Sequence, residues 1–219
     1  MKKVLFILFV FVLIGYFPII VAAQSNDSIE EFSTISKEPS TKELLTISKE
    51  PSTDGWISIQ GDSITILYSP DADIRKLEAR LRERDVPINQ EYRTLLSNRS
   101  LSMKDRLKAR IEIILLRVKD ILGMDPTDLH ITIRIFKTRK EMNGAYALMF
   151  NEKIFRYRNL KSFYVHHFKS IYTNEQDILD SVMAHELGHA VIDHYFSVPP
   201  PSRMAELMAI YVDAQLDQV

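Results

Sequence analysis

Residues 181–192 read SVMAHELGHAVI and contain the pattern H-E-x-x-H, with His185 and His189 four residues apart. Positions i and i+4 of a helix lie on one face, one turn apart, so both imidazoles can reach one zinc ion at about 2.1 Å. Glu186 follows the first histidine, so its side chain would project beside the metal and not onto it. A general base that takes a proton from a water molecule on the metal must lie there. The stretch therefore predicts a zinc-binding helix with a base next to the metal.

Apolar residues surround this motif, as a buried active-site helix requires. They are Ile178, Leu179, Val182, Met183, Ala184, Leu187, Ala190, Val191 and Ile192. The alternative, two surface histidines near an acid, is less compatible with so apolar a run. We expect the helix to reach about Phe196, with Asn174 as a candidate cap. Gly188 indicates a neighbouring element passing close to the helix; alternatively it is a tolerated helix glycine that costs roughly 1 kcal/mol.

HELGH within VMAHELGHAVI resembles the zincin metallopeptidases, and the resemblance covers about residues 165–215. Metzincins extend the motif to H-E-x-x-H-x-x-G-x-x-H, but this chain has Ile192 and Tyr195 where the glycine and the last histidine would fall. Gluzincins instead take a glutamate from a second helix downstream. Glu206, in MAELMAIY, is placed for that role. The chain is therefore similar to the gluzincin branch.

The resemblance implies zinc held by His185, His189 and Glu206, with a fourth position open for water and Glu186 as the general base of peptide-bond hydrolysis. The other interpretation of Glu206 is a solvated acid near a helix start, favoured by the helix dipole. A second hypothesis is a non-catalytic zinc-binding interaction module on a peptidase-like scaffold. A structural zinc has no need of Glu186, which favours the enzyme.

In gluzincins an acid often follows the ligand glutamate by four residues and orients a histidine, but this chain has Ile210 there. Asp213 and Asp193 are candidate substitutes, and either could equally be an exposed helix acid. Peptide hydrolysis also needs a donor to the developing oxyanion. The sequence offers five candidates without choosing among them, namely His166, His167, His194, Tyr195 and Tyr211.

The N-terminal residues 1–23 have the features of a secretory signal peptide, with two lysines, an apolar run over residues 4–21 and small residues before Gln24. An uncleaved membrane anchor is the alternative. Cleavage after Ala23 leaves 26 basic and 29 acidic residues, a charge of −3. We expect an exported periplasmic or extracellular protein, without nucleic-acid partners or membrane insertion after cleavage. The chain has no cysteine, so disulfides do not stabilise its fold.

Residues 24–55 have the composition of a disordered linker, rich in Ser, Thr, Lys, Glu and Pro. The octapeptide TISKEPST occurs in them twice, at residues 34–41 and 46–53, with a period of 12. Two copies are too few for a solenoid. We interpret the stretch as a tether between the export signal and a folded domain at 56–219. A recognition peptide for a partner is the alternative.

The pattern within residues 56–219 indicates an α+β domain. It predicts a hairpin of strands 56–60 and 63–68 around Gly61-Asp62, followed by helix 73–84. A long helix should begin at the cap Ser102 and reach Leu122, with Gly123 as its stop, and strand 130–136 follows it. A capping box at Thr138 opens the next helix, which reaches about Phe150; a strand or hairpin over 162–172 and a helix over 203–216, capped by Ser202, come after it. The resemblance implies a small mixed sheet with an edge strand beside the cleft. An extended peptide substrate would then pair with 162–172 as an added strand.

Overall fold

A computed structural model describes residues 49–81, 100–150 and 160–216. The predicted signal peptide 1–23 and the linker up to residue 48 lie outside the described residues. Within them, no helix is both long enough and apolar enough to cross a membrane.

Five strands form one mixed sheet in the order β1-β2-β3-β5-β4. Their bounds are Ile57–Gln60 for β1, Ile64–Tyr68 for β2, Ile131–Phe136 for β3, Ser162–Val165 for β4 and Ser170–Asn174 for β5. The pairs β1–β2 and β4–β5 are antiparallel, whereas β3 is parallel to both β2 and β5. The hairpin predicted around Gly61-Asp62 is therefore confirmed, and of the two alternatives for 162–172 the hairpin is the one that forms. The second one closes through a short 3-10 helix, η4, at His166–Phe168.

Five helices complete the described fold, and the α+β class is confirmed. They are α3 (Ile74–Arg80), α5 (Met103–Leu122), α6 (Arg139–Phe150), α7 (Asp180–Tyr195) and α8 (Ser202–Leu216). Ser102 caps α5 as predicted, because its hydroxyl accepts the N–H of Asp105 at 3.2 Å. Gly123 ends that helix with a φ of 62°, a left-handed conformation that glycine adopts without strain.

Three predicted helix boundaries are wrong. Asn174 does not cap α7, because its side-chain oxygen instead accepts the N–H groups of Gln176 and Asp177 in a turn after β5. The residue before α7 is Leu179, which makes no side-chain capping bond. Helix α8 begins at Ser202 itself, with the carbonyl of Pro201 accepting its first N–H bonds. Helix α3 ends at Arg80, before the predicted residue 84.

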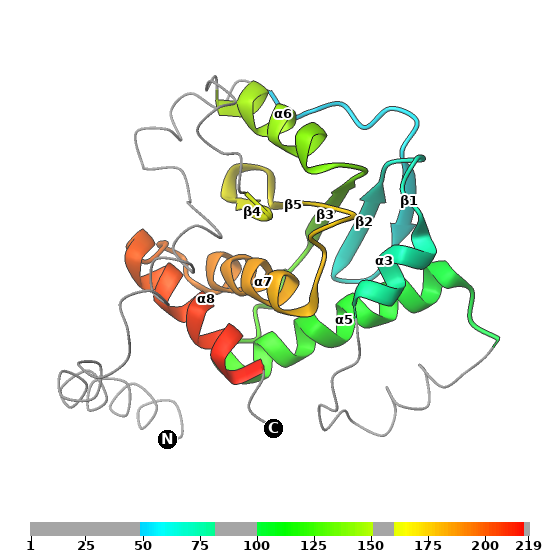
Figure 1. The fold of residues 1–219 in the computed structure, drawn as a ribbon. Helices are drawn as coiled ribbons and strands as arrows, with labels where there is room; N and C mark the ends of the chain where they lie inside the picture. Colours follow the sequence, from blue (N-terminus) through cyan, green and yellow to red (C-terminus); the bar gives the residue numbers. More distant parts are fainter. Residues whose placement is uncertain (1–48, 82–99, 151–159, 217–219) are drawn as a thin grey trace, which may run out of the picture. The chain divides into compact units, whose positions relative to one another are not determined.

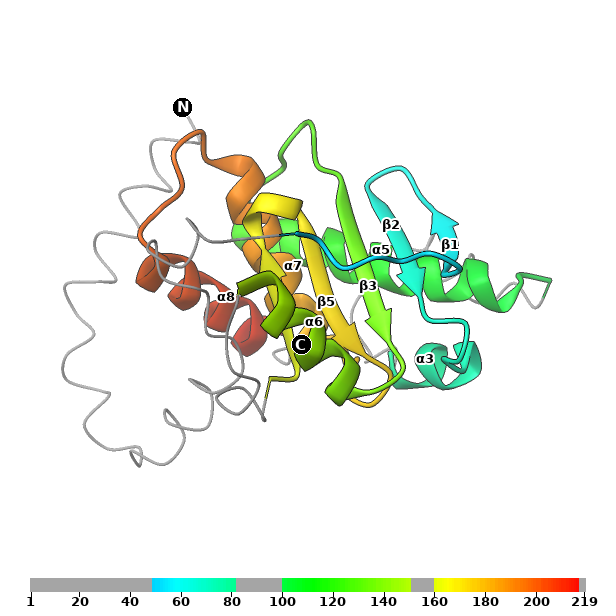
Figure 2. The same ribbon diagram turned by 90° about the horizontal axis from the view of Figure 1, so that it is seen from above.

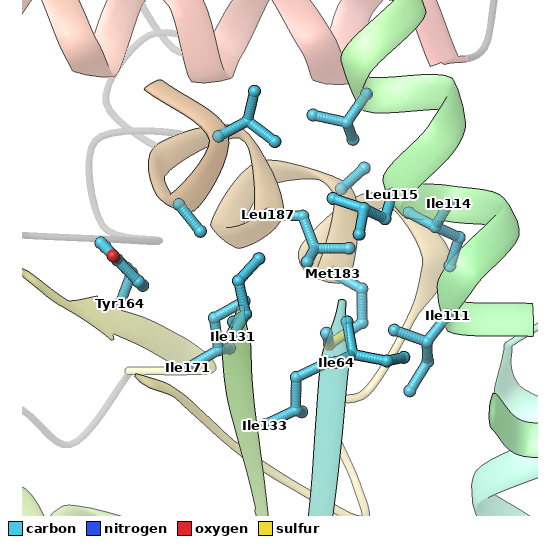
Figure 3. Packing of buried hydrophobic residues seen from close by; sticks show 14 of the residues in the cluster. Ile64, Ile111, Ile114, Leu115, Ile131, Ile133, Tyr164, Ile171, Met183 and Leu187 are labelled. Carbon is cyan, nitrogen blue, oxygen red and sulfur yellow. The ribbon is translucent and has the colours of Figure 1, made fainter. Parts of the chain in front are cut away.

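Helices lie on both faces of the sheet (Figure 1), and each face packs into an apolar cluster of its own. Side chains alternate between the faces of a strand, so Ile131, Ile133 and Ile135 of β3 all point to the side of α5 and α7. There they pack with Met183 and Leu187 of α7 and with the apolar stripe of α5 (Figure 3). Helix α6 covers the opposite face with a second cluster, which is largely aromatic. Helix α8 packs against α7 and α5. The predicted motif therefore lies on a helix that is buried under the sheet.

Candidate metal centre

His185 and His189 lie on one face of α7, and each is 2% exposed. Their Nε2 atoms are 3.2 Å apart. From α8, the carboxylate of Glu206 approaches both rings, with Oε1 at 3.7 Å from His185 Nε2 and Oε2 at 3.4 Å from His189 Nε2. The three predicted ligands therefore meet in one cluster, although they come from two helices.

The spacing of these donor atoms fits a small tetrahedral cation. Two ligand atoms bound about 2.1 Å from zinc at a tetrahedral angle are about 3.4 Å apart. The two Nε2 atoms are 3.2 Å apart, and the two oxygens of Glu206 lie 3.7 Å from His185 Nε2 and 3.4 Å from His189 Nε2, all close to that value. Two imidazoles and one carboxylate are donors that zinc accepts, and three protein ligands leave a fourth position for water or substrate. The three residues could thus hold a metal ion, and their donor atoms are of the kinds that zinc accepts.

Asp213 supports the cluster from α8, seven residues beyond Glu206. Its Oδ2 lies 3.0 Å from His185 Nδ1, and a carboxylate oxygen can only accept there, so Nδ1 donates. This contact holds the ring in the tautomer that directs the Nε2 lone pair at a metal. Of the two acids proposed from the sequence to orient a histidine, Asp213 is therefore the one in place.

The acidic surroundings of His185 change its proton affinity in the metal-free protein. Burial lowers the pKa of His185, but the hydrogen bond to Asp213 and the charges of Glu186, Asp213 and Glu206 outweigh it and raise the pKa to about 9. The metal-free site thus holds a proton at neutral pH. A divalent cation would take the place of that proton.

Glu186 is fully buried beside the two histidines, as expected of a general base. Its Oε1 accepts a hydrogen bond of 2.5 Å from the hydroxyl of Ser162, the first residue of β4. Its Oε2 has no hydrogen-bond partner within the described part of the chain. Burial raises the pKa of Glu186, so this carboxylate takes up a proton more readily than an exposed one.

Ser162 was not foreseen as a site residue. It lies two residues before Tyr164 on β4, so both side chains point to the same face of the strand, toward α7. Ser162 reaches Glu186, and Tyr164 reaches Asp193 two turns further along α7. A small polar residue at a buried position of an otherwise apolar strand was the available signal in the sequence.

Asp193 contacts the β4–β5 turn. Its Oδ2 accepts from Tyr164 Oη at 2.5 Å and from Lys169 Nζ at 2.6 Å, and its Oδ1 pairs with Nδ1 of His166. Lys169 has a φ of 48°, the one positive value for a non-glycine residue among the described residues. The acid thus holds a turn that contains a residue with positive φ.

The five candidates for an oxyanion donor remain unselected. His166 is paired with Asp193, and His194 donates from Nδ1 to the carbonyl of Ala190 at 2.8 Å. Tyr195 and Tyr211 are about half exposed, and His167 is also exposed.

Gly188 lies where α8 crosses α7, as its position in the motif indicated. A Cβ atom at this glycine would lie 3.6 Å from the Cα of Ala209 and from a methyl group of Val212, which are ordinary contact distances. The neighbouring helix therefore passes close without requiring glycine. The expected close approach of a neighbouring element is confirmed, and the alternative also applies, because the packing would accept a Cβ at this position.

Comparisons with known proteins add no relative to this picture. No protein-family model, no curated protein and no solved structure matches the chain.

Proposed function

We propose that the chain is an exported zinc-dependent peptidase of the gluzincin type. The observation that carries the proposal is that the ligand atoms of His185, His189 and Glu206 lie close enough together to hold one metal ion. The buried carboxylate of Glu186, directly after His185 on α7, lies beside them. The second element of support is Asp213, which holds His185 in the tautomer that a metal needs. A structural site would use neither a fourth open position nor Glu186.

The chemistry follows from the positions of the chain's own groups. A zinc ion held by the cluster would polarise the scissile carbonyl and lower the pKa of a water molecule toward 7. Ser162 holds one oxygen of Glu186, which leaves Oε2 to take a proton from the attacking water and deliver it to the leaving amine. Burial favours this step, because the raised pKa of Glu186 brings it nearer to that of the water.

The substrate in this proposal is an extended peptide. Strand β4 is at one end of the sheet, and within the described residues no strand pairs with its outer side. Strand β5 is paired on both sides, so within the predicted stretch 162–172 only β4 lies at the edge of the described sheet. A peptide that adds to β4 would run past Ser162 and therefore close to Glu186. This edge strand beside the motif helix is also the arrangement that the zincin resemblance implies.

Metal content tests the ligand set. The protein purified from a host that exports it should hold one zinc per chain by mass spectrometry, and Glu206→Gln should weaken zinc binding by at least a hundredfold. Glu141→Gln, an exposed glutamate in the first turn of α6, is the matched control and should leave zinc content unchanged. Full zinc retention in Glu206→Gln would remove this residue from the ligand set.

Activity tests the reaction. Glu186→Gln should keep its zinc and lose about 10²- to 10⁴-fold in cleavage of a peptide library, because the base is gone while the ligands remain. Glu141→Gln again serves as the control. Unchanged cleavage in Glu186→Gln would overturn the proposal. A zinc-loaded parent protein that cleaves no peptide would support the non-catalytic binding module instead.

A further inference from the structure

The end of the predicted linker lies against the sheet, although the sequence assigned all of 24–55 to a disordered tether. Residues 49–56 cross β5 and β3 toward β1 (Figure 2). The contacts agree with this path, because Glu50 meets side chains of both strands and the ring of Trp56 packs edge-on against Phe136 at 4.9 Å. The path lies on the face opposite α7, away from the metal cluster.

Glu50 occupies a carboxylate-binding site made of Arg134, Ser170 and Tyr172, called here the Arg134 site. Arg134 Nη2 lies 2.6 Å from Glu50 Oε1, the Tyr172 hydroxyl donates to the same oxygen at 3.1 Å, and Ser170 Oγ lies 3.4 Å from it. Arg134 and Tyr172 are register partners on β3 and β5, and the guanidinium lies 5.9 Å from the centroid of the tyrosine ring.

The burial of Arg134 favours an anion beside its guanidinium group. The residue is 7% exposed, and its Nε and Nη1 have no hydrogen-bond partner in the described part of the chain. A buried cation is strongly destabilising when it is unpaired. Glu50 satisfies one of its nitrogens, so the site is built for a carboxylate and retains donors for further acceptors.

The segment that supplies the carboxylate to this site occurs twice in the sequence. Glu50 belongs to the second copy of TISKEPST, at 46–53, and Glu38 holds the same position in the first copy, at 34–41. Because the two octapeptides are identical, the Arg134 site can make the same contacts with either copy. Only the length of chain that follows distinguishes them, six residues from Glu50 to Trp56 and eighteen from Glu38.

We propose that the Arg134 site is a peptide-binding site for the Lys-Glu-Pro-Ser-Thr segment, and that copy 34–41 competes with copy 46–53 for it within the same molecule. A threefold longer closing loop disfavours the first copy by about fivefold, so the second copy predominates while the first remains accessible. Exchange shortens the tether before the domain by one 12-residue period. The repeat is thereby a two-position anchor on the sheet face opposite the metal cluster.

A fluorescently labelled TISKEPST peptide, titrated into the full chain, tests this competition. In the wild type the second copy blocks the site and the peptide binds weakly. Glu38→Gln should change little, and Glu50→Gln should tighten peptide binding no more than about fivefold, because the first copy takes over. The double variant has no competing carboxylate and should bind the peptide at least a further tenfold more tightly, since a tethered competitor acts at millimolar effective concentration.

Matched controls make the result decisive. The same peptide with glutamine in place of its glutamate should not bind, and Tyr172→Phe in the double variant should weaken binding by removing one donor. Thermal unfolding confirms that each variant is folded. Glu50→Gln binding as tightly as the double variant would overturn the competition. A folded double variant that ignores the peptide would overturn the site, and concentration-dependent dimers of Glu50→Gln would show exchange between molecules, contrary to the proposal.

Discussion

Two carboxylates lie seven residues apart on α7, Glu186 and Asp193, and the protein satisfies them in different ways. Each accepts a hydrogen bond from a hydroxyl group on β4, Glu186 from Ser162 and Asp193 from Tyr164. Asp193 also has Lys169 and His166, so two groups that can carry positive charge surround it. Glu186 has the neutral hydroxyl alone on one oxygen, beside the two histidines of the cluster.

The two sets of partners suit different roles, a structural contact for Asp193 and, in the proposed reaction, proton transfer for Glu186. A carboxylate with fixed partners on both oxygens holds together the elements that supply those partners. A buried carboxylate with one oxygen left over has a raised pKa and can exchange a proton with a small molecule. Helix α7 thus carries both kinds of carboxylate, and the partners that β4 and the following turn supply distinguish Asp193 from Glu186.

The largest expected effect concerns metal affinity near Glu186. Asp213→Asn should weaken zinc binding by about 10- to 100-fold, because the partner that orients a ligand histidine loses its charge. Asp193→Asn should leave zinc affinity unchanged if this acid serves the turn only. Competition with a chromophoric chelator measures both. A larger loss of zinc affinity in Asp193→Asn than in Asp213→Asn would contradict the roles assigned to the two acids.

Stability is the property that Asp193 should govern. Asp193→Asn removes the charge that Lys169 and His166 face and should lower the free energy of unfolding by about 2 kcal/mol, or Tm by roughly 5 °C. Asp125→Asn is the control, since it breaks the exposed pair with Lys119 and should cost under about 1 kcal/mol. Thermal melts of the metal-free proteins decide, and equal losses would mean that burial of the Asp193 contacts adds nothing.

Metal binding should depend on pH through His185. Its folded-state pKa of about 9 lies above the ordinary 6.5, so zinc displaces a proton below pH 9. Apparent zinc affinity should rise about tenfold per pH unit from 7 to 9 and then level off. The same shift stabilises the metal-free protein fully below pH 6.5, and this contribution is lost as pH rises through 9. Calorimetry in buffers of different ionisation enthalpy should find about one proton released per zinc at pH 7.5; no release would contradict the raised pKa.

The smallest effect is expected at Gly188. Gly188→Ala places a methyl group at ordinary contact distance from Ala209 and should stabilise the protein by up to about 1 kcal/mol through helix propensity. Zinc affinity should not change. Chemical denaturation provides the measurement, with Gly144→Ala in α6, where a Cβ would meet nothing within 4 Å, as the control. Loss of zinc in Gly188→Ala alone would show that α8 needs a closer approach than this packing indicates.

Spacing within one helix made the α7 residues predictable, whereas contacts between elements were not. His185, Glu186 and His189 form one H-E-x-x-H motif, and the helical period alone brings the two histidines together. The choice of Asp213 over Asp193 depends on how α8 crosses α7, which no local pattern encodes. Ser162 was missed for the same reason, because it matters only once β4 lies beside the motif helix. Asn174 was assigned to the wrong structure because its side chain bonds equally well in a turn and at a helix start.

Because Ser162 belongs to β4 itself, the element that would register the substrate is also the one that positions the base. An added strand can shift along β4 only in steps of two residues if the same side chains are to stay on the same face. The pairing register on β4 would then determine which peptide bond of the substrate lies next to Glu186. On a long repetitive peptide we expect product lengths that differ by two residues, a readout of strand registration that needs no knowledge of side-chain preference.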